Sequence, residues 1–419
     1  MSERHGNPDT PLNLPHRALP PILPLSGRIR HYHWGGTRFI PELLGIANPD
    51  GRRHAEYWLG AHPQAPSTVR FGRRKVDVDA LIEHDPDRLL GPTVAARFGE
   101  LPFLFKILDV ERPLSIQIHP DRAQAEAGFA RENSAGIPLD APHRTFRDPN
   151  PKPEFLLALD DFRLLYGIRP ESELASTVAE TPGVSDGLPA LRAEGPAGLV
   201  HWILHLPADR LERAVDRLGA HVAALPTRQR RDRDQPWAWI RDWLARHRSA
   251  PARLHDRGLL FLPLMHLIRL HAGQGVLVGA GRPHAYLSGA GLEIMTNSDN
   301  VIRAGLTGKH TDPELLSTHV DLSPAPPRVM APTSRGGCRI YTPSRPEFDL
   351  RILEAGPGSP VEPATDHGPA IALVLEGEAE LAGKLRLETG QSALVLPGQR
   401  CRIEAPCPAR LAWATAGHG

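Results

Sequence analysis

A short alternating stretch in the first third of the chain carries side chains that could hold a metal ion. From 114 to 119, apolar residues alternate with Ser115, Gln117 and His119. A period of two is the signature of a β-strand, so one face is apolar and the other presents a hydroxyl, an amide oxygen and an imidazole. A Gln and a His on one strand face can bind a metal through one oxygen and one nitrogen. The same pattern also fits a half-buried strand whose polar side chains are simply hydrogen-bonded, and both interpretations stay open at this point.

Further candidate ligands lie downstream, on two other segments with strand character. Glu154 opens the apolar run FLLAL, and His284 shares a strand face with Tyr286. Together with Gln117 and His119 they offer two imidazoles, one carboxylate and one amide oxygen, a set that suits zinc and leaves room for water or substrate. A single histidine on a strand is more often structural, so the prediction depends on the joint occurrence of these residues.

Basic residues occur close to these candidates in the sequence. Among its 49 Lys and Arg residues the chain has lysine only at 75, 106, 152, 309 and 384. Lys106, Lys152 and Lys309 fall within the same segments as the candidate ligands, and Arg303 lies near Lys309. Because lysine supplies a compact and titratable ammonium, this placement supports a functional role. A metal surrounded by cations suits an anionic, oxygen-rich substrate such as a sugar phosphate.

Composition places the chain among ordinary globular proteins. Its 419 residues predict two or three domains, and 41% hydrophobic with 23% charged residues are typical values. The net charge of +1 gives no electrostatic case for nucleic acid or an acidic membrane, and no apolar run is long enough to span a bilayer. The three cysteines Cys338, Cys401 and Cys407 argue against a disulfide framework and fit a reducing compartment. We therefore expect a monomeric, cytoplasmic protein whose partner is a small anionic substrate.

The composition of the sequence and the spacing of its apolar residues change along the chain and indicate four regions. Residues 1–24 lack an apolar signal core and are expected to form a flexible leader. Short strands and turns predominate in 25–170 and 258–330, which we expect to form the metal-containing catalytic domain. Between them, 171–257 repeats apolar residues at helical spacing and predicts a helical insert domain. The Pro- and Gly-rich part 331–419 predicts a C-terminal β-sandwich or jelly roll.

Several of these segments, taken in order, resemble a known enzyme family. The motifs LPFLFKILDVERPLSIQIHPD, KPEFLLAL, GRPHAYLSGAGLEIM and SDNVIRAGLTGKHTD look like those of type I phosphomannose isomerase, and AEYWLGAHPQAPS and VLEGEAEL match its style. The resemblance runs from about residue 25 to the C-terminus and is weakest in the expected helical insert. It implies a mainly β protein with cupin-type jelly-roll domains and an α-helical insert.

The resemblance also implies a cofactor and an activity. The cofactor is one zinc ion, held by Gln117, His119, Glu154 and His284. The reaction is the reversible interconversion of mannose 6-phosphate and fructose 6-phosphate through a cis-enediol, which feeds mannose and GDP-mannose metabolism. It requires a base that moves a proton between the first two carbons, and acid–base groups that open the sugar ring.

Four further residues receive expected catalytic roles on the same basis. Arg303 is expected to stabilise the anionic intermediate as a fixed cation. Glu293 and Lys152 are the candidates for proton transfer, and Asp299 could orient Arg303 from four positions away. The alternative for Asp299 is a loop-capping role.

Substrate binding is expected from a second group of residues. Lys106, Ser115 and Lys309 could contact the phosphate, and Tyr286 could contact the sugar. The alternative for Tyr286 is core packing with its hydroxyl satisfied.

One position departs from the family pattern. The residue before Lys152 is Pro151, where many relatives carry a histidine proposed to assist ring opening. This protein then uses another group for that step or accepts the open-chain sugar. His310, next to Lys309, cannot be assigned a place from the sequence.

Two other functions remain as alternatives. A metal-dependent cupin of the dioxygenase type favours three histidines and one carboxylate around iron, whereas this chain offers an amide and two matched histidines. A non-catalytic sugar-binding cupin needs neither Arg303 and Glu293 nor two lysines beside the ligands, and it binds without turnover.

Overall fold

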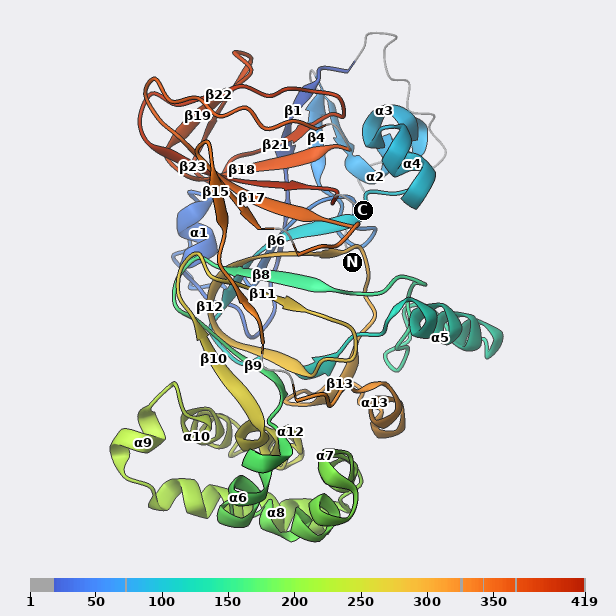
Figure 1. Cartoon of the computed structure of the whole chain (residues 1–419), viewed down its shortest axis with the longest axis vertical. Coiled ribbons are helices and arrows are strands. Elements are labelled where there is room, and N and C mark those ends of the chain that lie inside the picture. Colours follow the sequence, from blue (N-terminus) through green and yellow to red (C-terminus); the bar gives the residue numbers. More distant parts are fainter. Residues whose placement is uncertain (1–18, 72–73, 325–326, 342, 366–367, 418–419) are drawn as a thin grey trace. The chain divides into compact units, whose positions relative to one another are not determined.

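The computed structural model describes residues 19–71, 74–324, 327–341, 343–365 and 368–417. Within this part of the chain the backbone groups into two compact units (Figure 1). Unit 1 consists of Met1–Arg28, Trp58–Leu104 and Ser334–Gly419, and unit 2 consists of Ile29–Tyr57 and Phe105–Thr333.

Unit 1 is built on a nine-stranded sheet with the order β15-β16-β17-β23-β18-β21-β1-β4-β5. The strands of this sheet are β1 Ile22–Ser26, β4 Thr68–Phe71, β5 Arg74–Asp77, β15 Thr333–Arg335, β16 Cys338–Tyr341, β17 Asp349–Ala355, β18 Ala370–Glu376, β21 Ser392–Val395 and β23 Ala409–Thr415. A three-stranded sheet contains β19 Glu378–Leu381, β20 Leu385–Glu388 and β22 Ile403–Glu404. Three short helices follow β5, namely α2 Val78–His84, α3 Pro86–Leu90 and α4 Pro92–Phe98. Alternating apolar residues of these strands bury a core around the fully enclosed Trp413.

The strand β1 changes the expected boundaries at both ends of the chain. It lies between β21 and β4, with Ile22 opposite Val395 and Leu25 opposite Val69. The expected leader 1–24 therefore overlaps a paired strand, while residues 1–18 lie outside the described part of the chain. The segment 58–104, which we assigned to the catalytic domain, groups instead with the C-terminal strands. Pairing over such a sequence distance leaves no local signature in the sequence, which explains the difference.

Unit 2 is built mainly on an eleven-stranded sheet. Its strands are β2 Arg28–Arg30, β3 Glu56–Leu59, β6 Phe103–Val110, β7 Ile116–Ile118, β8 Glu154–Ala158, β9 Phe162–Ile168, β10 Met265–Leu270, β11 Gly275–Val278, β12 His284–Thr296, β13 Ile302–Gly305 and β14 Val329–Met330. The 13-residue strand β12 is its centre, because its first half pairs with β7 and β9 and its second half pairs with β8. One strand thus brings several others to a common place.

Helices are more prominent than a mainly β protein would suggest. Unit 2 contains α1 Phe39–Leu43, α5 Arg122–Ser134, α6 Glu171–Glu180, η1 Ser185–Gly187, α7 Leu188–Leu204, α8 Ala208–Ala224, α9 Thr227–Arg231, α10 Pro236–Arg246, α11 Pro251–Leu254, α12 Gly258–Phe261, η2 Leu262–Leu264 and α13 Pro313–His319. The helical periodicity in 171–257 corresponds to α6–α11, and in α8 the residues Leu211, Val215 and Leu218 are buried as their spacing predicts. Figure 1 shows these helices gathered beside β9 and β10.

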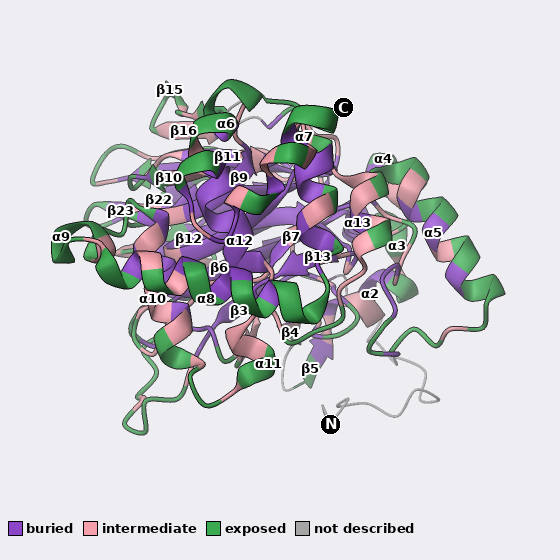
Figure 2. Ribbon diagram, turned by 90° about the horizontal axis from the view of Figure 1, so that it is seen from below, coloured by how far each residue is buried: buried purple, intermediate pink, exposed green. Residues whose placement is uncertain are grey.

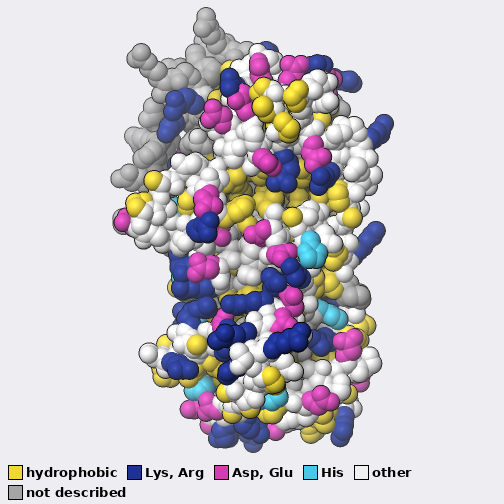
Figure 3. Space-filling view, turned by 90° about the vertical axis from the view of Figure 1, so that its left-hand side faces the viewer, with side chains coloured by type: hydrophobic (Ala, Val, Ile, Leu, Met, Phe, Trp, Pro, Cys, Tyr) yellow, Lys and Arg dark blue, Asp and Glu magenta, His cyan; other side chains and the backbone are white. Residues whose placement is uncertain are grey.

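The pattern of burial differs between the strands and the helices. Figure 2 shows buried strands in the interior and helices such as α5 and α8 with exposed outer faces. On the surface that Figure 3 presents, Lys and Arg side chains gather in one region with Asp and Glu side chains among them. No helix in the described residues is both long and apolar enough to cross a membrane.

Candidate metal centre

Three buried residues from separate segments meet at one place in unit 2. His119 directly follows β7, Glu154 is the first residue of β8 and His284 is the first residue of β12. Strand pairing contributes to this meeting, because Gln117 lies opposite His284, and Glu154 lies opposite Val278, shortly before His284 in the chain. One potential ligand atom from each of His119, Glu154 and His284 lies within 4.8 Å of the others, and all three side chains are buried. This geometry matches three of the four metal ligands expected from the sequence.

The two imidazoles are oriented as metal ligands are. Nδ1 of His119 donates to the Asn300 carbonyl oxygen at 2.9 Å, and Nδ1 of His284 donates to the Arg282 carbonyl oxygen at 3.0 Å. The proton on each ring is thereby fixed at Nδ1, and Nε2 keeps its lone pair. Both Nε2 atoms lie near the carboxylate of Glu154, at 3.2 and 3.3 Å, yet neither makes a well-aligned hydrogen bond within the described residues. Buried polar atoms without a partner are rare in native proteins and point to an ion between them.

The electrostatics keep this site in its metal-binding protonation state. Burial lowers the pKa of His119 to about 4, so the ring is neutral at pH 7. Burial also opposes ionisation of Glu154, but the Lys152 ammonium, with Nζ 3.0 Å from Oε1, acts against it, and the pKa of Glu154 lies well below the usual range. An ionised carboxylate and neutral imidazoles are the forms that ligate metals.

A second buried ion pair lies next to the three candidate ligands. Nζ of Lys106 is 2.9 Å from Oε2 of Glu293, and both side chains are buried. Burial of Lys106 alone would lower its pKa, but Glu293, Glu56 and Glu154 raise it above its usual value. Burial raises the pKa of Glu293 despite Lys106. Lys106, for which we expected a contact with the phosphate, is in this structure the charge partner of the proton-transfer candidate Glu293.

Tyr286 connects the two pairs. Its hydroxyl donates a long hydrogen bond, 3.4 Å, to Oε2 of Glu154. Burial, with Glu293 and Glu154 nearby, raises the pKa of the phenol well above its usual value. The side chain is therefore a neutral donor inside the site, which combines both interpretations we considered, a packed aromatic ring and a polar contact.

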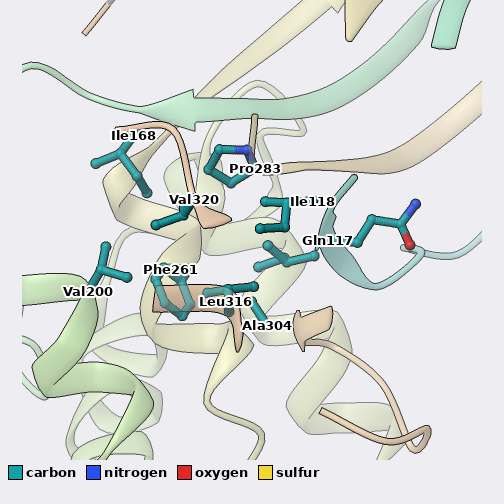
Figure 4. A pocket seen from close by; sticks show the side chains of 10 residues that line it. Gln117, Ile118, Ile168, Val200, Phe261, Pro283, Ala304, Leu316 and Val320 are labelled. Atoms are coloured by element: carbon teal, nitrogen blue, oxygen red, sulfur yellow. The ribbon is translucent and has the colours of Figure 1, made fainter. Parts of the chain in front are cut away.

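The strand β7 presents two chemically different faces, as its alternation predicts. Ile116 and Ile118 are buried and line a small apolar pocket together with residues of β9, β13 and the helices. Figure 4 shows the Ile118 side chain on the side of Val320 and Leu316, whereas the amide of Gln117, which also lines the pocket, points away from them. The Gln117 amide oxygen accepts a hydrogen bond from the Ser115 hydroxyl at 3.0 Å.

Cations gather on the neighbouring strand β13. Arg303 lies opposite Gln117 in the β7–β13 pairing. Burial, with Arg147 nearby, lowers the pKa of Arg303 to about 10, so the guanidinium stays charged at neutral pH, while Asp299 acts in the opposite direction. Burial and Arg303 together lower the pKa of Lys309, and Arg147 adds to the effect. Lys309 therefore lies within electrostatic range of Arg303 and Arg147.

Asn300, next to the predicted site residue Asp299, has a structural role. The Asn300 amide Nδ2 donates to the carbonyl oxygens of Asp148 and Asn150, at 2.8 and 2.9 Å, and its Oδ1 accepts from the Arg147 amide at 2.7 Å. Asn300 thereby ties the loop that orients His119 to the segment that leads into Glu154. Its place beside Asp299 in the motif SDN was the available signal, but a loop-capping role was the simpler interpretation.

Comparison with known proteins agrees with this geometry. Residues 22–171 match the family model "Phosphomannose isomerase type I, catalytic domain". Mannose-6-phosphate isomerase of Salmonella typhimurium is 36% identical over 386 residues, which cover 88% of this chain and 94% of that protein. The rat enzyme is 31% identical over 371 residues, 82% of this chain and 84% of that protein. This chain belongs to the type I phosphomannose isomerase family.

A solved structure of the family supports the same conclusion. The crystal structure of mannose 6-phosphate isomerase from Salmonella typhimurium bound to its substrate and a zinc atom has a TM-score of 0.84, is 33% identical, and covers 95% of this chain and 100% of that one. The zinc atom in that structure agrees with the buried His-Glu-His group of this chain, which could hold a metal ion.

The departure from the family pattern lies inside the site. Pro151 is buried and immediately precedes Lys152. The ring of His310 packs against that of His143, with 6.4 Å between the ring centroids. The described contacts of His310 therefore do not connect it to Lys152 or Glu154.

Proposed function

We propose that the protein is a zinc-dependent aldose–ketose isomerase that interconverts mannose 6-phosphate and fructose 6-phosphate. The observation that carries this proposal is the buried group His119, Glu154 and His284, with two ion-paired lysines beside it, in a chain of this family. A binding protein would not need two buried charge pairs next to a metal group, because burying them is costly.

The residues present fit zinc. Two neutral imidazoles with free Nε2 atoms and one ionised carboxylate are ligands that zinc prefers, and Gln117 is the fourth ligand in our proposal. A bound zinc ion supplies Lewis-acid polarisation of the substrate oxygens. The described group contains two histidines, which argues against the iron site with three histidines that we considered.

Glu293 is the proton-transfer base in this proposal. The isomerisation moves one hydrogen from C2 to C1 of the sugar and one from O2 to O1, so a carboxylate that takes the proton from one carbon can return it to the other through a cis-enediol. Burial raises the pKa of Glu293 and makes it a stronger base, while the Lys106 ammonium at 2.9 Å holds its orientation. Lys152 is engaged by Glu154 at 3.0 Å and serves to keep that carboxylate ionised.

The cations on and near β13 bind the phosphate and stabilise the negative charge of the reaction intermediate in this proposal. Arg303 remains charged at any working pH and suits stabilisation of the anionic intermediate, with Asp299 as its orienting neighbour. Lys309, with Arg147 nearby, binds the phosphate. Ser115 orients the Gln117 amide through their hydrogen bond rather than binding phosphate.

The domain roles follow from where these residues lie. We propose that unit 2 holds the catalytic centre in a cupin-type jelly roll, that 171–257 is a helical insert without metal ligands, and that unit 1 is a second jelly roll. Every residue assigned above to metal, proton transfer or phosphate belongs to unit 2. The enzyme acts as a monomer in this proposal.

A coupled assay with mannose 6-phosphate tests the proposal. The purified protein should form fructose 6-phosphate, lose activity after treatment with a chelator, and recover it when zinc is added back. Sugar binding without turnover would favour the non-catalytic cupin, and activity that depends on oxygen and iron would favour the dioxygenase.

A further inference from the structure

The turn after β13 is held in a strained shape. Leu306 follows the end of β13 and has a φ of 53°, a left-handed conformation that non-glycine residues rarely adopt. Its side chain is buried. Such strain persists only where the surroundings impose it. The turn leads directly to Lys309, so whatever imposes its shape also sets the position of that lysine.

Asp256 supplies the constraint from the far end of the helical region. Its Oδ1 accepts hydrogen bonds from the backbone amides of Gly258 and Leu306, both at 2.7 Å, and its Oδ2 accepts one from Thr307 at 3.0 Å. The carboxylate is buried, and burial raises its pKa against the effect of these amides. Three backbone donors converging on one buried carboxylate form a rigid clamp on the turn.

Close backbone packing completes the clamp. A Cβ atom at Gly258 would lie 2.5 Å from the Leu306 nitrogen, and one at Gly305 would lie 2.4 Å from the Gly258 nitrogen. Both positions therefore require glycine. The guanidinium of Arg253 packs closely on Gly308: a Cβ atom at position 308 would lie 3.2 Å from its Nη2 atom. The end of the helical region thus supports the turn along its whole length.

The last link runs from the turn to Lys309. The Thr307 hydroxyl accepts a hydrogen bond from the Lys309 backbone amide at 3.0 Å. Thr307 is itself fixed by Asp256 at 3.0 Å, so the chain of contacts from Asp256 to Lys309 is continuous. Lys309 lies in the electrostatic range of Arg303.

We propose that Asp256 is a positioning residue for the substrate phosphate: it clamps the turn 305–308 so that Lys309 meets the phosphate beside Arg303. This inference rests on the proposed function. It assigns a role to the helical region, which contributes no ligand but sets the geometry of the anion site. The ligand class is a phosphate monoester, recognised by a lysine and an arginine.

The replacement Asp256→Asn tests the clamp. An amide of the same size keeps one acceptor oxygen but turns an NH2 group toward the Thr307 or Leu306 amide. KM for mannose 6-phosphate should rise by about tenfold or more, kcat should change by less than about threefold, and zinc content should stay the same, because binding and not chemistry is affected. Asp242→Asn is the matched control: Asp242 lies on α10 and pairs with Arg241 and Arg233, away from the clamped turn, so this variant should leave both constants unchanged.

A second pair of variants keeps the test valid if Asp256→Asn does not fold. Thr307→Ala removes the acceptor for the Lys309 amide, whereas Thr307→Ser keeps it. KM should rise severalfold in the first and return close to the wild-type value in the second.

Inorganic phosphate separates this inference from the proposed function. Its dissociation constant, measured by calorimetry without any turnover, should rise in Asp256→Asn and in Thr307→Ala. In a Lys309→Met background, Asp256→Asn should add little further loss, because both changes act on one contact. Unchanged phosphate affinity in the folded variants, or fully additive losses, would overturn the role of Asp256 even if the enzyme is an active isomerase. A lack of isomerase activity in the wild type would instead refute the proposed function.

Discussion

At the scale of single residues, the site contains two buried ion pairs, each formed by a lysine and a glutamate. Lys152 lies beside Glu154 and Lys106 lies beside Glu293, at 3.0 and 2.9 Å. Buried ion pairs seldom add stability over apolar residues, so their presence points to function. The residue types were visible in the sequence, but the pairing of Lys106 with Glu293 was not, because it joins positions 187 residues apart.

The replacement Arg303→Lys separates charge stabilisation from phosphate binding. Lysine keeps the positive charge but loses the planar fork that can grip two oxygens. We expect kcat to fall by about 10²-fold or more, as for loss of one oxyanion donor, while KM moves less and zinc content stays unchanged. A near-normal kcat with only a raised KM, in steady-state kinetics, would make Arg303 a phosphate anchor instead.

At the scale of elements, local residue patterns predicted individual strands and helices. The alternation around Gln117 predicted a strand with one apolar and one polar face, and β7 has both, although the strand is limited to Ile116–Ile118. The period of 171–257 predicted helices, and α8 buries the predicted stripe. The clamp of Asp256 on Leu306 and Thr307 could not be predicted, since hydrogen bonds that a carboxylate accepts from a distant backbone have no periodic signature.

The helical region should bind no catalytic metal. Four of its histidines pack against other rings, as in the stacking of His201 on His205 and the packing of His247 on Trp243. We expect alanine at any one of these positions to leave the zinc content unchanged. The four variants are His201→Ala, His205→Ala, His221→Ala and His247→Ala. Metal analysis of each folded variant checks this, and a large loss of zinc in any of them would refute the assignment.

An ion pair between α7 and α13 should make stability depend on pH. His205 follows α7 and its Nε2 lies 2.8 Å from Oε1 of Glu314, while its Nδ1 bonds to the His201 carbonyl oxygen. These two contacts raise the pKa of His205 above its usual 6.5, against burial and the nearby Arg257. A raised folded pKa means that the stabilisation is complete below about pH 6.5 and disappears as the pH rises through the folded pKa.

The variant Glu314→Gln should therefore be less stable than the wild type in mildly acidic solution and equally stable in alkaline solution. Urea unfolding across this pH range measures the difference, with Glu194→Gln, an exposed position, as control. A difference that stays constant with pH would show that the charge on His205 contributes nothing.

At the scale of the whole molecule, the two units interleave along the chain. Unit 1 takes its strands from both ends of the sequence, and β1 lies between β4 and β21. Composition could not reveal this, because residues 19–24 look like the end of a loose leader until their pairing partners are known. The family pattern, by contrast, extended over almost the whole chain and led to the correct family.

The strand β1 should be essential for unit 1. Leu23 is fully buried between its neighbours, whereas the adjacent Pro24 is exposed. Leu23→Ala should lower the free energy of unfolding by about 2–5 kcal/mol through the cavity it leaves, and Pro24→Ala should change it by only about 0.5 kcal/mol. Denaturant unfolding of the two variants checks this, and equal values for both would mean that β1 is not part of the core.

The most direct test of the account measures zinc and isomerase activity together in His119→Ala and His284→Ala. Each change removes one of the two buried Nε2 atoms that face Glu154. We predict that each purified, folded variant contains much less zinc than the wild type and has lost nearly all conversion of mannose 6-phosphate to fructose 6-phosphate. Full zinc occupancy in both variants would contradict the assignment of the metal centre.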